Sequence, residues 1–355
     1  MSEPDANGIR GAAARVVLYE RMQRIRHFES EAERQYKAAR IGGYCHVSSG
    51  QEATSVGAVE ALTEADLLVT GYRCHGFALA RGVPPEAVMA ELFGRRSGCA
   101  HGRGGSMHLL DPSRGYYGGW GIVAGQLPIA TGLAMALVRQ GREDAVLCEL
   151  GEGAVNMGAW HESLNLASLW RLPIVYLVTN NRYGMGTSVE RASAEPEVFR
   201  RAQAHRMAGE RVDGDDLDEV LGATERLLAC AREKHAPAVL EAMTYRFRGH
   251  SVADAGLSYR TKDEIAAHQA RDPIQRFRDK LLEAGISKAE LTTADERARA
   301  TVESAVAFAT DDAEPRLDEL AVGMYAPGSE EQFQRMLPGS PFGERELVFA
   351  GGLGR

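Results

Sequence analysis

Apolar and polar positions along this chain follow two periods, one helical and one extended, and together they predict an α/β protein. After residue 12, the apolar residues Met22, Ile25 and Phe28 recur at roughly helical spacing with charged residues between them, and Gly42-Gly43 ends the pattern. Helices are expected at residues 12–40, 51–62, 84–94, 128–139, 155–170, 263–284, 288–310 and 313–322. Short apolar runs predict buried strands at residues 66–70, 145–150, 174–178 and 238–242.

The clearest of these patterns is a strand–turn–helix–strand unit in the middle of the chain. The strand at 145–150 leads into the turn Gly151-Glu152-Gly153, and the helix at 155–170 then returns the chain to the strand at 174–178. A crossover helix makes the two strands parallel, and parallel sheets are covered by helices on both faces. The predicted fold class is therefore α/β, with a mainly parallel sheet between two layers of helices.

Loops and termini divide the chain further. The glycine-rich stretch 94–126 and the polar stretch 246–262 lack periodicity, and long ordered loops of this kind are usually functional. Residues 1–11 are expected to be a disordered lead, residues 12–325 a single catalytic domain, and residues 326–355 an extended tail rich in glycine and proline.

Charge and cysteine usage exclude several classes of protein. The chain has a formal net charge of −8, which argues against a general nucleic-acid binder, and no apolar run reaches the roughly 18 residues that span a bilayer. The five cysteines are scattered without metal-binding spacing, which is typical of reduced thiols. We therefore expect a cytoplasmic protein that binds neither nucleic acid nor membrane.

The turn Gly151-Glu152-Gly153 is a candidate phosphate site, because glycines at a strand end allow the backbone to approach phosphate oxygens. Alone this signal is weak. A carboxylate beside a phosphate needs a cation between them, and Mg²⁺ prefers such hard oxygen ligands. The next strand is followed by Asn180-Asn181, whereas an NAD-binding Rossmann unit would place an acid there. Glu152 and Asn181 are therefore expected to converge on one metal ion.

The run from Gly151 to Thr187, GEGAVNMGAWHESLNLASLWRLPIVYLVTNNRYGMGT, resembles the thiamine-diphosphate motif, which begins GDG and ends NN. Further blocks resemble the alpha subunits of thiamine-diphosphate-dependent 2-oxo acid dehydrogenases of the pyruvate dehydrogenase type, and they occur in that family's order. These blocks are HVSSGQEA (46–53), GYRCHG (71–76), GRRSGCAHGRGGSMH (94–108), YYGGWGIVAGQ (116–126), YRFRGHSVADAGLSYRTKDEI (245–265) and RDPI (271–274).

The resemblance implies a thiamine-diphosphate-binding fold and assigns roles to individual residues. The implied magnesium ligands are Glu152, Asn181 and the carbonyl of Tyr183. The implied cofactor contacts are Tyr72, Arg73, Gly153, Ala154 and His250 on the diphosphate side and Gly121 and Val123 on the aminopyrimidine side. The implied catalytic residues are His46, His250 and His75. The chain departs from the motif at Glu152, where the family has aspartate.

The function implied by the resemblance is oxidative decarboxylation of pyruvate, with transfer of the acetyl group to a lipoyl group. The resemblance also implies a β subunit, an α2β2 heterotetramer, a lipoyl acyltransferase partner and activity only in the presence of the β chain. Three alternatives stay open at this point: an acetoin or branched-chain 2-oxo acid dehydrogenase alpha subunit, a catalytically silent cofactor-binding subunit in which Glu152 marks a degenerate site, and an NAD-binding protein.

Overall fold

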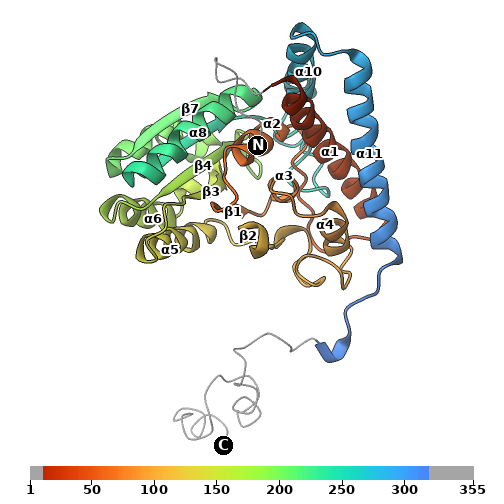
Figure 1. The fold of residues 1–355 in the computed structure, drawn as a ribbon, viewed down its shortest axis with the longest axis horizontal. Helices are drawn as coiled ribbons and strands as arrows, with labels where there is room; N and C mark the ends of the chain where they lie inside the picture. Colours follow the sequence, from red (N-terminus) through yellow and green to blue (C-terminus); the bar gives the residue numbers. More distant parts are fainter. Residues whose placement is uncertain (1–10, 320–355) are drawn as a thin grey trace, which may run out of the picture. The chain divides into compact units, whose positions relative to one another are not determined.

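A six-stranded parallel sheet forms the centre of the structure, a computed structural model that describes residues 11–319 (Figure 1). The strands are β1 (Leu67–Gly71), β2 (Tyr116–Trp120), β3 (Val146–Gly151), β4 (Ile174–Asn180), β7 (Ala208–Asp213) and β8 (Ala238–Met243). Their order is β2-β1-β3-β4-β8-β7, and every pairing between neighbours is parallel. The predicted α/β class with a mainly parallel sheet is confirmed.

Helices account for most of the remaining described chain. The α-helices are α1 (Ala12–Lys37), α2 (Glu52–Glu60), α3 (His75–Ala80), α4 (Pro85–Leu92), α5 (Gln126–Arg139), α6 (Gly158–Leu169), α7 (Val189–Ala192), α8 (Leu217–Lys234), α9 (Lys262–Gln269), α10 (Pro273–Glu283) and α11 (Lys288–Asp311). Within the described part of the chain, no helix is both long and apolar enough to cross a membrane.

Alternate residues of the central strands point into two separate cores, one on each face of the sheet. Leu147, Val175 and Leu177 belong to the core that also contains buried residues of α1, α2, α8 and α11. Their neighbours Val146 and Tyr176 belong to the other core, which contains buried residues of α5 and α6. Since side chains alternate along a strand, a continuous apolar run fills both cores at once. This is why these strands are apolar throughout.

Several elements differ from the sequence-based expectations. The helix expected at 263–284 is two helices, α9 and α10, because Asp272 caps a new helix at Pro273 by accepting the N–H of Ile274 at 2.8 Å. The helix expected at 155–170 begins only at Gly158, after a 3₁₀ turn over Glu152–Asn156. The long loop at 94–126 contains β2, and the sequence patterns did not predict β7 or α8.

The expectations for the two ends of the chain concern a lead at residues 1–11, a helix at 313–322 and a tail at 326–355, and the structure describes only part of these residues. No helix covers residues 313–316, and a short 3₁₀ turn, Leu317–Glu319, follows them. The expected disordered lead falls almost wholly on residues 1–10, and the expected tail at 326–355 falls within residues 320–355. Both stretches lie outside the residues that the structure describes.

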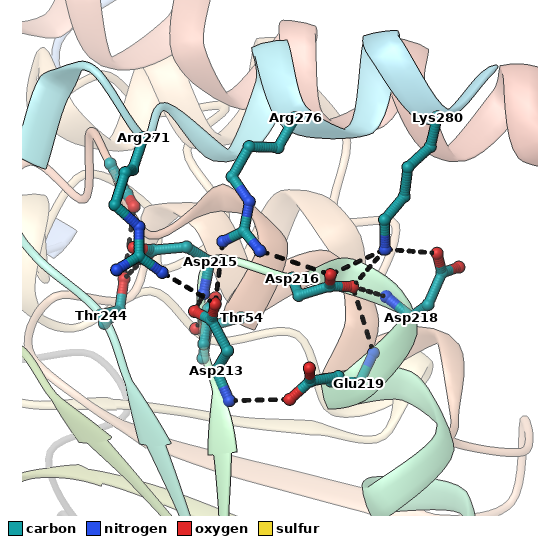
Figure 2. A network of polar contacts seen from close by, with 12 residues as sticks. Thr54, Asp213, Asp215, Asp216, Asp218, Glu219, Thr244, Arg271, Arg276 and Lys280 are labelled. Atoms are coloured by element: carbon teal, nitrogen blue, oxygen red, sulfur yellow. Dashed lines mark hydrogen bonds and ion pairs between the residues drawn. The ribbon is translucent and has the colours of Figure 1, made fainter. Parts of the chain in front are cut away.

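An acidic turn between β7 and α8, residues 213–218, holds both ends of the polar segment that connects β8 to α10 (Figure 2). At one end, Asp215 accepts the hydroxyl proton of Thr244 at 2.7 Å. At the other end, Asp213 accepts from Arg276 at 2.9 Å, and both carboxylate oxygens of Asp216 accept from Lys280 at 2.7 Å. The segment is thus anchored at Thr244 and, beyond its other end, at α10, and residues near its start reach the site at the strand ends.

Candidate cofactor site

A cavity of about 390 Å³ lies at the carboxyl ends of β1, β3 and β4. The sheet changes winding direction between β1 and β3, since β2 lies on one side of this pair and β4 on the other. Ligands of open parallel sheets bind at such a switch point, outside the carboxyl ends of the strands. The cavity is lined by Tyr72 and Arg73 after β1, by Glu152 and Gly153 after β3, and by Asn181 after β4, among others.

The strand register brings Glu152 and Asn181 together, as the sequence predicted. Gly151 pairs with Thr179 across β3 and β4, so the next residues leave neighbouring strand ends. Glu152 is buried, and its Oε2 accepts the backbone N–H of Asn181 at 3.2 Å. Burial raises the pKa of the Glu152 carboxyl group, because a charge is costly where water is excluded. A cation at this position would offset that cost.

Arg246 places a cation beside the predicted metal ligands. Its Nη1 donates to Asn181 Oδ1 at 2.6 Å and to the Tyr183 carbonyl, and its Nη2 donates to the Met185 carbonyl and, at 3.1 Å, to the Tyr259 hydroxyl. The Arg246 side chain is fully buried. Two of the three predicted ligand oxygens therefore already face a positive charge, and this set of hard oxygens fits Mg²⁺. Arg246, which lies four residues before His250, was not predicted as a site residue from the sequence.

The segment Tyr72-Arg73, which follows β1, forms another part of the cavity wall. The buried guanidinium of Arg73 donates to the Val47 carbonyl at 2.7 Å and to the His250 carbonyl at 2.9 Å. It therefore ties the chain before α2 to the segment that carries His250. Burial lowers the pKa of Arg73. Because Arg73 lines the cavity, its positive charge would attract an anion bound there.

His46, Tyr72 and His250 form one aromatic cluster, in which Tyr72 and His250 line the cavity and His46, which is not a lining residue, packs against both. The ring centroids lie 4.6 Å apart for His46 and Tyr72 and 5.0 Å apart for the two histidines. Burial, followed by the charge of Arg73, lowers the pKa of His46 to about 3 and that of His250 to about 4. Both imidazoles are therefore neutral near pH 7, and each can donate one proton and accept another.

The structure does not bring His75 to this cluster. His75 is fully buried at the start of α3, where its Nδ1 lies 2.7 Å from a carboxylate oxygen of Glu29 and its Nε2 lies 2.8 Å from the Ser106 hydroxyl. Both ring nitrogens thus have partners inside the protein, and His75 is absent from the cavity wall. This arrangement is that of a packing residue that joins α1, α3 and the glycine-rich loop.

The remaining predicted contacts lie in two loops. Gly153 and Ala154 line the cavity from the 3₁₀ turn that precedes α6, so the amide groups nearest the cavity belong to that turn rather than to the α-helix. Val123 lines the cavity and is 45% exposed. Gly121 is not among the lining residues, and a Cβ atom there would lie 2.9 Å from Nε2 of the exposed His108 side chain, which would have to shift.

The cavity wall also contains polar side chains that had not been predicted. Among them are Glu149, near the end of β3, and Gln126, the first residue of α5, and both are buried. Gln126 Nε2 donates to the Glu149 carbonyl at 3.1 Å. Glu149 could have been identified from the sequence because it interrupts the apolar run of a predicted buried strand, where a charged residue is rare.

Comparison with known proteins places the chain in a family. The family model described as "Dehydrogenase E1 component" matches residues 20–318. The chain is 42% identical over 310 residues to the somatic-form, mitochondrial pyruvate dehydrogenase E1 component subunit alpha of Homo sapiens, which covers 87% of this chain and 78% of the relative. It is 43% identical over 304 residues to the pyruvate dehydrogenase E1 component subunit alpha of Rhizobium meliloti (strain 1021), which covers 85% of this chain and 87% of the relative. The chain therefore belongs to the dehydrogenase E1 component family.

Proposed function

We propose that this chain is the alpha subunit of a pyruvate dehydrogenase and that its cavity binds the diphosphate end of thiamine diphosphate together with Mg²⁺. The family to which the chain belongs is thiamine-diphosphate-dependent, and the relatives named above act on pyruvate. The single observation that carries the proposal is the convergence of Glu152 and Asn181 at neighbouring strand ends, in a cavity that Tyr72 and Arg73 also line. Family membership also makes the NAD-binding alternative untenable.

The residues of the chain would divide the work of binding. Glu152, Asn181 Oδ1 and the Tyr183 carbonyl would hold the metal, while Arg73 and the amide groups of the 3₁₀ turn would face the diphosphate. When bound, the cofactor supplies an electron sink for decarboxylation of a 2-oxo acid. The neutral ring of His250 in the cavity wall would offer a donor and an acceptor to a bound substrate without adding charge, and the neutral ring of His46 packs against it.

A β subunit is part of this proposal. The family's alpha subunits act with a beta chain, and apolar side chains stand exposed around the cavity. Ile122, beside the lining residue Val123, is 73% exposed, and Met185, itself a lining residue, is 66% exposed. Exposed apolar residues at a site entrance are typical of a surface that another chain covers. We propose an α2β2 assembly that passes its acetyl group to the lipoyl group of an acyltransferase.

We also propose that the protein works in the cytoplasm. All five cysteines are free thiols in the structure, and three of them are buried. Unpaired cysteines are typical of a reducing compartment. Fractionation of the source cells with an antibody against the chain would test this location, and recovery of the protein outside the cytoplasmic fraction would contradict it.

Co-expression with a beta-type chain tests substrate and assembly together. The purified complex is expected to decarboxylate pyruvate faster than acetoin or 3-methyl-2-oxobutanoate, in each case only with thiamine diphosphate and Mg²⁺ present. Preference for either of the other substrates would support the acetoin or branched-chain alternative. In the same assay, a silent cofactor-binding subunit would show no turnover until Glu152→Asp restores the family's aspartate.

A further inference from the structure

Glu149 is a second carboxyl group in the wall of the cofactor cavity, and no role given above uses it. It is 5% exposed and lines the same cavity as Glu152. Its Oε2 accepts the backbone N–H of Gly71 at 3.0 Å. Among residues 11–319, no side-chain cation is hydrogen-bonded to it, because Arg73 and Arg246 donate to other groups.

The groups around Glu149 come from every element that meets at this end of the cavity. Arg73 follows β1, Thr179 belongs to β4, and Glu152 begins the 3₁₀ turn after β3. Tyr72, which precedes Arg73, is close enough that the charge of Glu149 contributes to raising its pKa. Burial, with a smaller contribution from the charge of Glu152, raises the pKa of Glu149 to about 7, against the lowering effects of Gly71, Thr179 and Arg73. Gln126, from α5, contributes a buried Oε1 atom with no hydrogen-bond partner among the described residues.

A diphosphate in this cavity would add negative charge beside two carboxyl groups. The metal ion of the proposed function would balance Glu152, which belongs to the ligand set. Glu149 has no such partner, and like charges in a buried site favour the neutral form of a carboxyl group. A protonated carboxyl group no longer repels an anion and can donate a hydrogen bond. Although Arg73 opposes this effect, the added negative charge therefore favours a neutral Glu149 in the complex.

We propose that Glu149 is a proton-linked positioning residue, which binds one proton when thiamine diphosphate and Mg²⁺ enter the cavity and faces the bound anion as a neutral carboxyl group. This inference rests on the proposed function. It has a definite sign: cofactor binding is tightest where Glu149 is already protonated, and it weakens as the pH rises through the value of about 7 given above for the pKa of Glu149. The dissociation constant is expected to rise by up to about tenfold per pH unit above that point.

Calorimetric titration of the assembled enzyme with thiamine diphosphate at saturating Mg²⁺ tests the proton count directly. At pH 8, titrations in Hepes and in Tris, which have different ionisation enthalpies, give the number of protons bound. The wild-type enzyme is expected to take up nearly one proton more than the Glu149→Gln variant. The matched control is Glu143→Gln, which changes an exposed carboxylate before β3 and is expected to match the wild type.

Two further measurements keep the outcome decisive. Glu149→Asp keeps a titratable carboxyl group and is expected to restore most of the proton uptake, and the wild-type dissociation constant is expected to rise between pH 7 and pH 8.5. Equal proton uptake by the wild type and Glu149→Gln would overturn the inference, and so would a wild-type dissociation constant that is independent of pH. Failure of the wild-type assembly to bind the cofactor at all would instead overturn the proposed function.

Discussion

At the scale of single residues, the cofactor site depends on a few buried charges whose partners come from distant parts of the chain. Glu152 meets the amide of Asn181, and the guanidinium of Arg246 meets Asn181 Oδ1 and the Tyr183 carbonyl. Each is buried, so each is stable only while its partners stay in place. A change to one of these residues should therefore affect cofactor binding and stability in separable ways.

Removing the charge of Glu152 should weaken the metal site without removing an atom from the cavity wall. Glu152→Gln keeps the shape and one carbonyl oxygen but loses the negative charge that Mg²⁺ favours. We expect the Mg²⁺-dependent affinity for thiamine diphosphate to fall at least ~10-fold, equivalent to about 1.4 kcal/mol. Titration of the assembled enzyme measures this. Glu162→Gln, an exposed change on α6, is the control and should bind like the wild type.

Removing Arg246 should cost stability that the metal partly restores. Arg246→Gln leaves the buried Oδ1 of Asn181 and the less buried carbonyl oxygens of Tyr183 and Met185 short of a donor, which destabilises the fold by about 2–4 kcal/mol. Mg²⁺ with thiamine diphosphate should raise the melting temperature of the variant more than that of the wild type, because the ion would use two of the same oxygens. An equal rise in both proteins would contradict this. The control, Arg248→Gln, alters a half-exposed side chain paired only with Glu33 and should change stability by less than about 1 kcal/mol.

At the scale of elements, the acidic turn between β7 and α8 fixes the position of the segment that carries Arg246 and His250 by bonding to residues at both of its ends. Thr244 at its start bonds Asp215, and α10 after its end bonds Asp213 and Asp216 (Figure 2). Asp215 is buried, and burial raises its pKa to about 7. One carboxyl group of this clamp therefore titrates near neutral pH.

Asp215 should make the wild-type fold less stable as the pH rises. Its folded-state pKa lies above the ordinary aspartate value, so the folded state binds the proton more tightly, and stability is lost as the pH rises from about 4 to about 7. Asp215→Asn keeps an acceptor for Thr244 and removes this loss. We expect the variant to be more stable than the wild type by about 2 kcal/mol at pH 8, with the difference shrinking toward pH 5. Urea unfolding at both pH values measures the free energies, and a variant that is less stable at pH 8 would refute the prediction.

How much of the fold the sequence predicts also depends on the kind of element. The buried strands β3 and β4 are continuous apolar runs that serve two cores, and this pattern is local. The edge strand β7 carries Glu210, Arg211 and Asp213 and has no clear alternation, because only one neighbour constrains it. Helix α8 did carry a readable signal, since Leu217, Val220, Leu221 and Thr224 are buried at helical spacing behind the capping residue Asp216.

The site shows the same limit. The convergence of Glu152 and Asn181 follows from parallel strand ends, which the sequence predicts. The place of His75 depends on Glu29 and Ser106, which are far away in the chain, and its own motif contains no sign of them. Arg246 and Glu149 act through burial, which is known only after the fold is assembled.

At the scale of the whole molecule, the described chain has a cavity whose wall contains charged and polar groups suited to an anion and a metal ion, and exposed apolar residues lie around it. Ile122 and Met185 are the most exposed of these. In the proposed assembly the β chain covers this side and completes the reaction site, so activity belongs to the complex rather than to either chain. A charged residue at one of the exposed apolar positions should weaken association with the β chain without affecting the folding of this chain.

Ile122→Glu places a carboxylate on the proposed interface, where it would lose water without gaining a partner. Because the side chain is 73% exposed in this chain, the variant should fold with a melting temperature close to that of the wild type. Sedimentation of the variant mixed with the β chain should show at least ~10-fold weaker association. Unchanged association would place the interface elsewhere.

The most direct test of the central claim is the rate of carbon dioxide release from pyruvate, measured for this chain alone, for the β chain alone and for the mixture, each with and without thiamine diphosphate and Mg²⁺. Release is expected only from the mixture, only with the cofactor present, and it should be strongly reduced when the mixture carries Glu152→Gln. Full-rate release by this chain alone would contradict the proposed function, as would a well-assembled mixture that binds the cofactor and releases no carbon dioxide from pyruvate.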